Sequence, residues 1–84
     1  MNIFLSSKAD KQLKKLPLRM KEVILPRIKL LSKDPLPAVS KKLINREGWR
    51  VRVGDYRILY TVDGKSKELT ILSIAHRKEA YRIL

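Results

Sequence analysis

The sequence predicts an α+β fold, with an N-terminal strand, a helical hairpin and a three-stranded antiparallel β-meander in the order βααβββ, followed by a short C-terminal segment. Two observations predict it. Apolar residues recur at helical spacing before Asp34, and from Lys42 onward they alternate with polar residues. At 84 residues the chain is below the usual size of two domains, so we expect one domain over residues 1–84.

The first half of the chain predicts a strand and two helices. Residues 2–6 form a short apolar stretch, which fits a strand, and Ser7 followed three residues later by Asp10 is typical of a cap residue just before a helix. Apolar residues then recur every three or four positions on both sides of Pro17, which indicates a helical hairpin. Pro26 lies inside the second helix and lacks a backbone donor, so we expect it to kink or shorten that helix.

The second half predicts the meander. In residues 49–53, Trp and Val alternate with Arg, which is typical of a strand with one buried and one polar face. Gly54-Asp55 fits a two-residue type II′ turn, because glycine accepts the positive φ of its first position. Residues 56–62 then form the next strand, residues 63–67 the next turn, and residues 69–75 the third strand.

The second face of these strands carries polar residues but is partly apolar. Leu59, Leu72 and Ile74 add apolar side chains to it, so we expect the sheet to be covered on both sides over part of its length. After the third strand, residues 78–84 are expected to form a short helical or irregular segment.

Charge is the main compositional signal. Twenty Lys and Arg against eight Asp and Glu give a formal charge of +12, which favours binding to a polyanion, most simply RNA. The alternative is a generally solvated basic surface. With no Cys and one His, we expect neither a metal site nor a small-molecule cofactor. No apolar run is long enough for a membrane span or a secretory signal, so we expect a cytoplasmic protein with no membrane partner.

Three arginines are expected to share one face of the meander. The predicted turn places Arg52 directly opposite Arg57, and Arg50 falls on the same face. Like charges in cross-strand register are destabilising, and a bound phosphate would offset the repulsion. The sequence therefore predicts that Arg50 and Arg52 bind RNA together with Arg57. In the alternative interpretation, long arginine stems merely cover the sheet while their charged ends stay in water.

A second candidate cluster follows the last strand. Cleavage of a phosphodiester without a metal ion needs a base, cations that stabilise the developing charge, and an acid. In residues 76–82, His76 and Tyr81 are the groups suited to moving protons. A tyrosine serves as a base only where neighbouring cations lower its pKa. Tyr81 could instead pack on the sheet or stack on an RNA base, and His76 could be structural.

Two stretches of the second half carry a family resemblance. One is Trp-Arg-Val-Arg-Val-Gly-Asp-Tyr-Arg-Ile-Leu-Tyr at residues 49–60, and the other is Ile-Ala-His-Arg-Lys-Glu-Ala-Tyr at residues 74–81. They resemble the C-terminal half of RelE/ParE superfamily toxins of type II toxin-antitoxin systems, closer to the RelE branch of mRNA interferases. The helical hairpin also fits, so the resemblance covers nearly the whole chain and implies a RelE-like toxin domain.

The resemblance implies a metal-independent endoribonuclease that cleaves mRNA in the ribosomal A site by 2′-hydroxyl attack. It makes Arg57 a phosphate clamp, Arg77 a stabiliser of the transition state or leaving group, and Tyr81 the base. Arg50 and Arg52 match positions that are lysines in the best-known RelE enzymes. Because arginine does not release its proton, these two positions supply charge only, and proton transfer rests on Tyr81 or His76.

The implied partners are the ribosome with its mRNA and a cognate antitoxin, which charge complementarity predicts to be acidic. Two other functions stay open at this point. A ParE-like toxin is noncatalytic and poisons DNA gyrase, and a basic RNA-binding module without toxicity would need only the charge.

Overall fold

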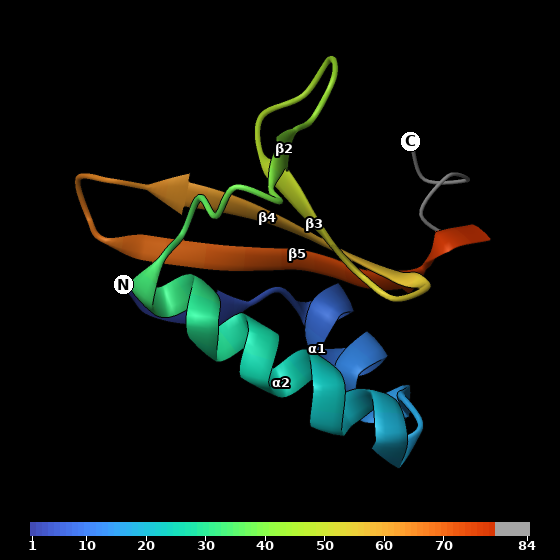
Figure 1. The fold of residues 1–84 in the computed structure, drawn as a ribbon. Coiled ribbons are helices and arrows are strands. Elements are labelled where there is room, and N and C mark those ends of the chain that lie inside the picture. Colours follow the sequence, from blue (N-terminus) through green and yellow to red (C-terminus); the bar gives the residue numbers. More distant parts are fainter. Residues whose placement is uncertain (79–84) are drawn as a thin grey trace.

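The computed structural model describes residues 1–78, whose arrangement is drawn in Figure 1. Two helices and five strands follow one another in this part of the chain. In chain order they are β1 (Asn2–Leu5), α1 (Ser7–Lys15), α2 (Leu18–Lys33), β2 (Lys41–Lys42), β3 (Trp49–Val53), β4 (Tyr56–Asp63) and β5 (Glu68–His76). Neither helix of this part is long and apolar enough to cross a membrane.

The strands form one mixed sheet in the order β1-β5-β4-β3-β2. Strands β3, β4 and β5 pair antiparallel, so the predicted α+β class and the β-meander are confirmed. Strand β1 lies parallel to β5 at one edge, and β2 pairs antiparallel with β3 at the other. The predicted order βααβββ lacked β2, because a strand of two residues has no alternation that a sequence pattern could reveal.

Helix α1 begins one residue earlier than the sequence predicted. The N-cap is Ser6, whose extended backbone ends the strand and whose Oγ accepts a hydrogen bond from the Ala9 backbone N–H at 3.0 Å. The same Oγ donates to the Leu72 carbonyl at 2.9 Å. The prediction of Ser7 as the cap was therefore wrong. The sequence alone does not show which of the two adjacent serines caps the helix. The hydrogen bond to Leu72 of β5 makes Ser6 the cap.

Helix α2 passes through Pro26 and continues to Lys33, so the prediction that this proline shortens the helix was wrong. Pro26 is exposed, and losing its single backbone donor does not stop a helix whose opposite side is firmly packed. That packed side consists of Ile24, Ile28 and Leu31, which are buried. Tertiary packing therefore outweighs the local penalty of the proline.

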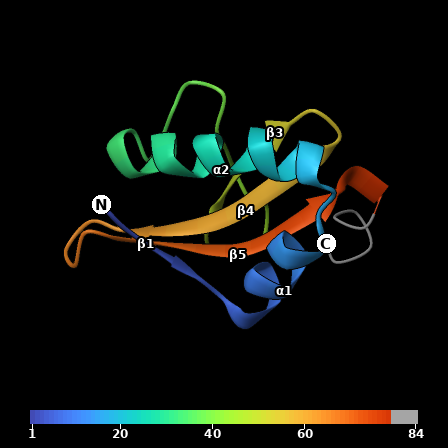
Figure 2. The same cartoon turned by 90° about the horizontal axis from the view of Figure 1, so that it is seen from below.

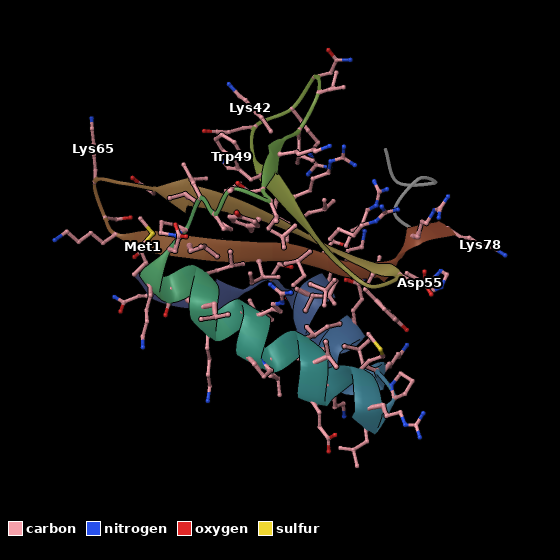
Figure 3. The ribbon with its side chains drawn as sticks, viewed as in Figure 1. Met1, Lys42, Trp49, Asp55, Lys65 and Lys78 are labelled. Atoms are coloured by element: carbon pink, nitrogen blue, oxygen red, sulfur yellow. The ribbon has the colours of Figure 1, made fainter. Side chains whose placement is uncertain are left out.

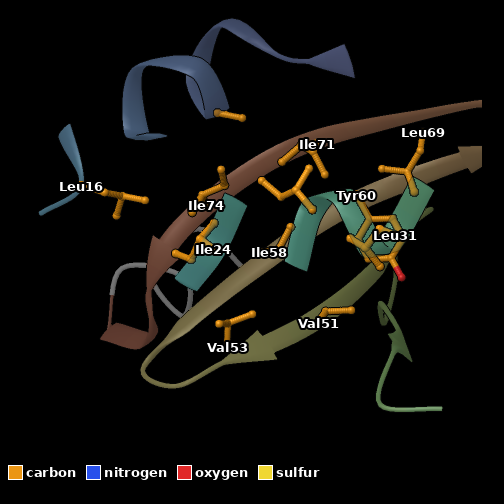
Figure 4. Close-up of a cluster of buried hydrophobic side chains, with 12 residues drawn as sticks. Leu16, Ile24, Leu31, Val51, Val53, Ile58, Tyr60, Leu69, Ile71 and Ile74 are labelled. Carbon is orange, nitrogen blue, oxygen red and sulfur yellow. The ribbon is translucent and has the colours of Figure 1, made fainter. Parts of the chain in front are cut away.

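Both helices cover the same face of the sheet (Figure 1), with α2 along β4 and β3 and α1 beside β5 and β1 (Figure 2). The core lies between these layers, and its buried residues are drawn in Figure 4. They are Ala9, Leu16, Ile24, Ile28, Leu31, Val51, Val53, Ile58, Tyr60, Leu69, Ile71 and Ile74. The face of the sheet without helices carries the arginines of the meander, but Leu59 and Ala75 on that face are buried as well, so the sheet is covered on both sides over part of its length, as predicted.

A bulge in β5 changes which residues share a face. Leu59 lies opposite Ser73 but Tyr60 lies opposite Ile71, so Leu72 has no partner across the strand. The Gln12 Oε1 accepts a hydrogen bond from the Ile74 backbone N–H at 2.7 Å. Because of the bulge, Ile74 lies opposite Ile58 in the core, and its predicted place beside Leu59 was wrong.

Candidate functional site

The turn between β3 and β4 has the predicted geometry. Val53 lies opposite Tyr56, so the loop is Gly54-Asp55, and Gly54 has φ +59°. Positive φ at Gly54, where a Cβ would raise the energy of the backbone, but not at Asp55 distinguishes a type II′ turn from a type I′ turn. The turn fixes the register of the hairpin and places Arg52 opposite Arg57, as predicted.

The arginine side chains lie on the face of the sheet away from the helices. Along β3, Val51 and Val53 enter the core, so Arg50 and Arg52 point to the other face because successive side chains alternate. Figure 3 shows nitrogen-bearing side chains gathered on that side of β3. Arg57 shares this face, since it lies opposite Arg52 on one side and Ala75 on the other.

These side chains line a pocket of about 330 Å³, here called the arginine pocket. Its lining residues are Val39, Lys41, Arg50, Arg52 and Arg57. Arg57 is 5% exposed, whereas Arg52 is exposed and Arg50 is half-buried. Four cations thus converge on one hollow, and among residues 1–78 no carboxylate lines it. Such a site attracts anions, and guanidinium groups match the oxygens of a phosphate.

Sequence reasoning missed Lys41, which is the fourth cation of the pocket. Lys41 lies opposite Arg50 in the pairing of β2 with β3. The intervening loop returns through Gly48, which has φ +127° and whose added Cβ would come 2.9 Å from the Tyr60 carbonyl oxygen. The Leu43 backbone N–H closes the loop by donating to the Gly48 carbonyl at 3.0 Å. The glycine at position 48 was the one sequence signal for this close approach of the loop to β4.

The loop of residues 34–40 forms one wall of the arginine pocket through Val39. The Tyr60 hydroxyl donates to the Pro35 carbonyl at 2.7 Å and fastens this loop to the sheet. Within the loop, the Ser40 backbone N–H and Oγ donate to the Pro37 carbonyl at 2.8 Å and 2.7 Å. Burial raises the pKa of the Tyr60 phenol above its ordinary value of 10.0, so the hydroxyl stays a hydrogen-bond donor even at pH 10.

His76 does not join the arginine pocket. It lies opposite Tyr56, one residue beyond Ala75, and therefore on the other face of the sheet from Arg57. Its ring meets that of Tyr56 edge to face, with centroids 5.5 Å apart and planes at 82°. Its Nδ1 accepts a hydrogen bond from the Lys78 backbone N–H at 3.4 Å. A role for His76 in RNA binding stays a prediction.

Arg77 follows β5 directly and is exposed. Its backbone N–H donates to the Asp55 carbonyl at 2.7 Å, which ties the end of β5 to the turn between β3 and β4. Arg57 and Arg77 therefore lie at the same end of the sheet. Tyr81, the predicted base, lies outside residues 1–78, so its position relative to them stays a prediction. Within those residues no three His, Asp or Glu side chains gather to hold a metal ion.

Comparison with known proteins identifies the family. A family model described as the ParE toxin of type II toxin-antitoxin system, parDE, matches residues 3–81. The RelBE2 toxin-antitoxin complex of Mycobacterium tuberculosis contains a chain 30% identical to this one, with a TM-score of 0.81 and coverage of 90% of this chain and 96% of that chain. The RelE-RelB complex of Pyrococcus horikoshii OT3 gives 25% identity, a TM-score of 0.76 and coverage of 90% and 93%.

The isolated RelE toxin of E. coli is 16% identical with a TM-score of 0.79, covers 99% of this chain and 98% of its own, and so shows a shared fold. No curated protein matches the chain. The match over residues 3–81 and the relative at 30% identity agree with the fold and with the predicted family. This chain therefore belongs to the ParE toxin family within the RelE/ParE superfamily, and it is a toxin of a type II toxin-antitoxin system.

Proposed function

We propose that this toxin is a ribosome-dependent mRNA endoribonuclease that acts in the cytoplasm, cuts mRNA in the A site and so inhibits translation. The observation that carries the proposal is the arginine pocket, where Lys41 and three arginines converge beside β3 and β4. Arg57 is only 5% exposed and lies opposite Arg52 across the two strands, and guanidinium groups match the oxygens of an RNA phosphate.

The proposed reaction needs no metal ion. The 2′-oxygen of one nucleotide forms a bond to the adjacent phosphorus, and the bond from phosphorus to the 5′-oxygen of the next nucleotide breaks. The products are a 2′,3′-cyclic phosphate and a 5′-hydroxyl, so the proton lost by the 2′-hydroxyl is balanced by one gained at the 5′-oxygen. Cations at the phosphate stabilise the additional negative charge that develops on its oxygens.

Each residue of the site has a role in this proposal. Arg57, fixed by the pairing of β4 with both neighbouring strands, clamps the phosphate. Arg77, held at the same end of the sheet by the bond to Asp55, stabilises the transition state or the leaving oxygen. Tyr81 takes the proton from the 2′-hydroxyl. Arg50, Arg52 and Lys41 bind the RNA backbone. His76, which the sequence predicted to bind RNA, lies on the other face of the sheet and takes no part at the arginine pocket.

A second candidate function is gyrase poisoning, which the match to the ParE toxin family favours. ParE-like toxins lack the set of catalytic Arg and Tyr residues. Arg57 and Arg77 in the fold, and Tyr81 in the sequence, favour the nuclease. In either case the resemblance predicts an acidic antitoxin as partner, and several of the similar structures are toxin-antitoxin complexes.

The decisive experiment is to induce the toxin in cells and map mRNA ends on translating ribosomes. The natural chain is compared with Arg77→Ala, with Tyr81→Phe and with the control Arg19→Ala, which changes an exposed arginine of α2. We expect cuts within A-site codons that disappear in the first two variants and persist in the control. Growth arrest with DNA damage and without mRNA cuts would refute the nuclease and support gyrase poisoning.

A further inference from the structure

The proposed reaction moves two protons, one away from the 2′-hydroxyl and one to the leaving 5′-oxygen. Without a metal ion, each transfer needs a side chain that can take up or release a proton. The sequence offered two such groups beyond the last strand, Tyr81 and His76. His76, however, lies on the other face of the sheet, against the ring of Tyr56. One of the two transfers therefore still lacks a side chain.

Among the described residues, Lys41 is the one lining residue of the arginine pocket that can release a proton. Three of the other lining residues, Arg50, Arg52 and Arg57, carry guanidinium groups, which stay protonated in proteins. The remaining one, Val39, is apolar. The ammonium of a lysine is a cation that can also give up a proton. Lys41 can thus do what its three neighbours cannot.

The fold holds the backbone on both sides of Lys41. Before it, the Ser40 backbone N–H and Oγ donate to the Pro37 carbonyl at 2.8 Å and 2.7 Å. After it, the Leu43 backbone N–H donates to the Gly48 carbonyl at 3.0 Å. Lys41 is exposed, and within the described part of the chain it makes no ion pair that would hold its ammonium away from the pocket. Its side chain therefore starts from a fixed point and can reach a bound phosphate.

Lys41 and Arg57 reach the pocket from opposite sides of β3. Lys41 pairs with Arg50 on the β2 side, and Arg57 pairs with Arg52 on the β4 side. Neighbouring strands lie about 4.8 Å apart, so strands β2 and β4 are about 10 Å apart and leave room for a phosphate between the two side chains. In an in-line displacement the attacking and leaving oxygens lie on opposite sides of phosphorus. A cation on each side of the phosphate suits that geometry.

We propose that Lys41 is the general acid of the nuclease described above, an assignment that rests on that proposed function. As the bond from phosphorus to the 5′-oxygen breaks, the Lys41 ammonium gives this oxygen one proton and becomes an amine. The base takes one proton from the 2′-hydroxyl, so the protons balance, and exchange with water restores both side chains after the products leave. Arg57 and Arg77 contribute charge alone.

The test replaces the leaving oxygen with sulfur. A thiol is far more acidic than an alcohol, so a bridging 5′-sulfur leaves as a thiolate and needs no general acid. Two synthetic mRNAs are placed on ribosomes with the same codon in the A site. One has natural linkages, and the other has a 5′-sulfur at the linkage that the natural chain cuts.

The natural chain is compared with Lys41→Arg, which keeps the charge but releases no proton. The control is Lys42→Arg, because Lys42 is an exposed neighbour that pairs with Trp49 and does not line the pocket. Binding is measured separately on ribosomes whose mRNA has a 2′-deoxynucleotide at the cut. This mRNA lacks the attacking hydroxyl, so it binds without reacting.

We expect Lys41→Arg to cut the natural linkage about 10²–10⁴-fold more slowly than the natural chain, which is the usual contribution of a general acid. The same variant should cut the sulfur linkage as fast as the natural chain does. Lys42→Arg should match the natural chain on both mRNAs. Binding to the 2′-deoxy mRNA and the melting temperature should be unchanged in both variants, because the charge is preserved.

Two results would overturn the assignment. Full activity of Lys41→Arg on the natural linkage would mean that Lys41 supplies charge only, and an equal loss on both linkages would mean that it only positions the RNA. A natural chain that cuts neither mRNA refutes the proposed function, and the assignment falls with it. A natural chain that cuts both, with a Lys41→Arg variant that sulfur does not rescue, refutes the assignment alone.

Discussion

Replacing Tyr60 with phenylalanine isolates the contribution of one hydroxyl to the wall of the arginine pocket. The ring of Tyr60 is fully buried in the core, and phenylalanine preserves its packing. The variant loses the 2.7 Å hydrogen bond to the Pro35 carbonyl and leaves that carbonyl without this donor. The cost is about 1 kcal/mol, which lowers the melting temperature of a domain of this size by about 4–8 °C.

The same variant has a second effect at alkaline pH. Because the folded protein holds the pKa of Tyr60 above 10.0, the unfolded chain ionises first as pH rises. The stability that this group contributes is complete below pH 10 and is lost as pH rises from there through the folded pKa. Unfolding by urea, measured between neutral pH and pH 11, should therefore show a loss of stability in the natural chain that is smaller in Tyr60→Phe.

The variant also tests the connection between the core and the site. Hydrogen exchange at the Ser40 and Lys41 amides should become faster in Tyr60→Phe, and RNA affinity should fall although no residue of the pocket has changed. Tyr56→Phe is the control, since it removes a different tyrosine hydroxyl, at the first residue of β4. An unchanged melting temperature and unchanged exchange at these two amides would refute the role assigned to the Tyr60 hydroxyl.

Three further substitutions test other parts of the fold and the site. Gly48→Ala should destabilise the chain by about 1–3 kcal/mol in urea unfolding, because φ +127° strains any Cβ and the Tyr60 carbonyl lies 2.9 Å away. Ser6→Ala removes the cap of α1, and calorimetry should show a loss of about 0.5–2 kcal/mol. Arg52→Gln should leave stability unchanged or raise it by about 0.2–1 kcal/mol, since it removes a like charge opposite Arg57. In the same variant RNA binding should weaken, and the slope of log affinity against log salt concentration should fall by about one. A loss of stability with unchanged RNA binding would contradict the last of these.

The sequence predicted the parts of the fold that depend on local patterns. The alternation around Trp49–Val53 and the Gly54-Asp55 turn gave both the strand pairing and the opposition of Arg52 and Arg57. Local patterns did not predict what long-range contacts decide. The bulge at Leu72 depends on contacts from Ser6 and from Gln12 of α1, and the passage of α2 through Pro26 depends on packing against the sheet.

The same difference between local patterns and long-range contacts decided which parts of the candidate site the sequence predicted. Arg50, Arg52 and Arg57 meet because they lie on two strands joined by a short turn, so their register follows from the sequence between them. Lys41 comes from a two-residue strand reached through a loop, and its place opposite Arg50 depends on the close approach of Gly48 to β4. Val39 reaches the same pocket because Tyr60 fastens its loop, a contact between residues far apart in sequence.

The arrangement of charge connects the stability of the toxin to its neutralisation. With a formal charge of +12 and four cations at one pocket, the free chain repels itself, and salt should stabilise it by screening that repulsion. The predicted acidic antitoxin would pair directly with such cations, and salt weakens pairing of that kind. Raising the salt concentration should therefore stabilise the free toxin and loosen its complex with the antitoxin.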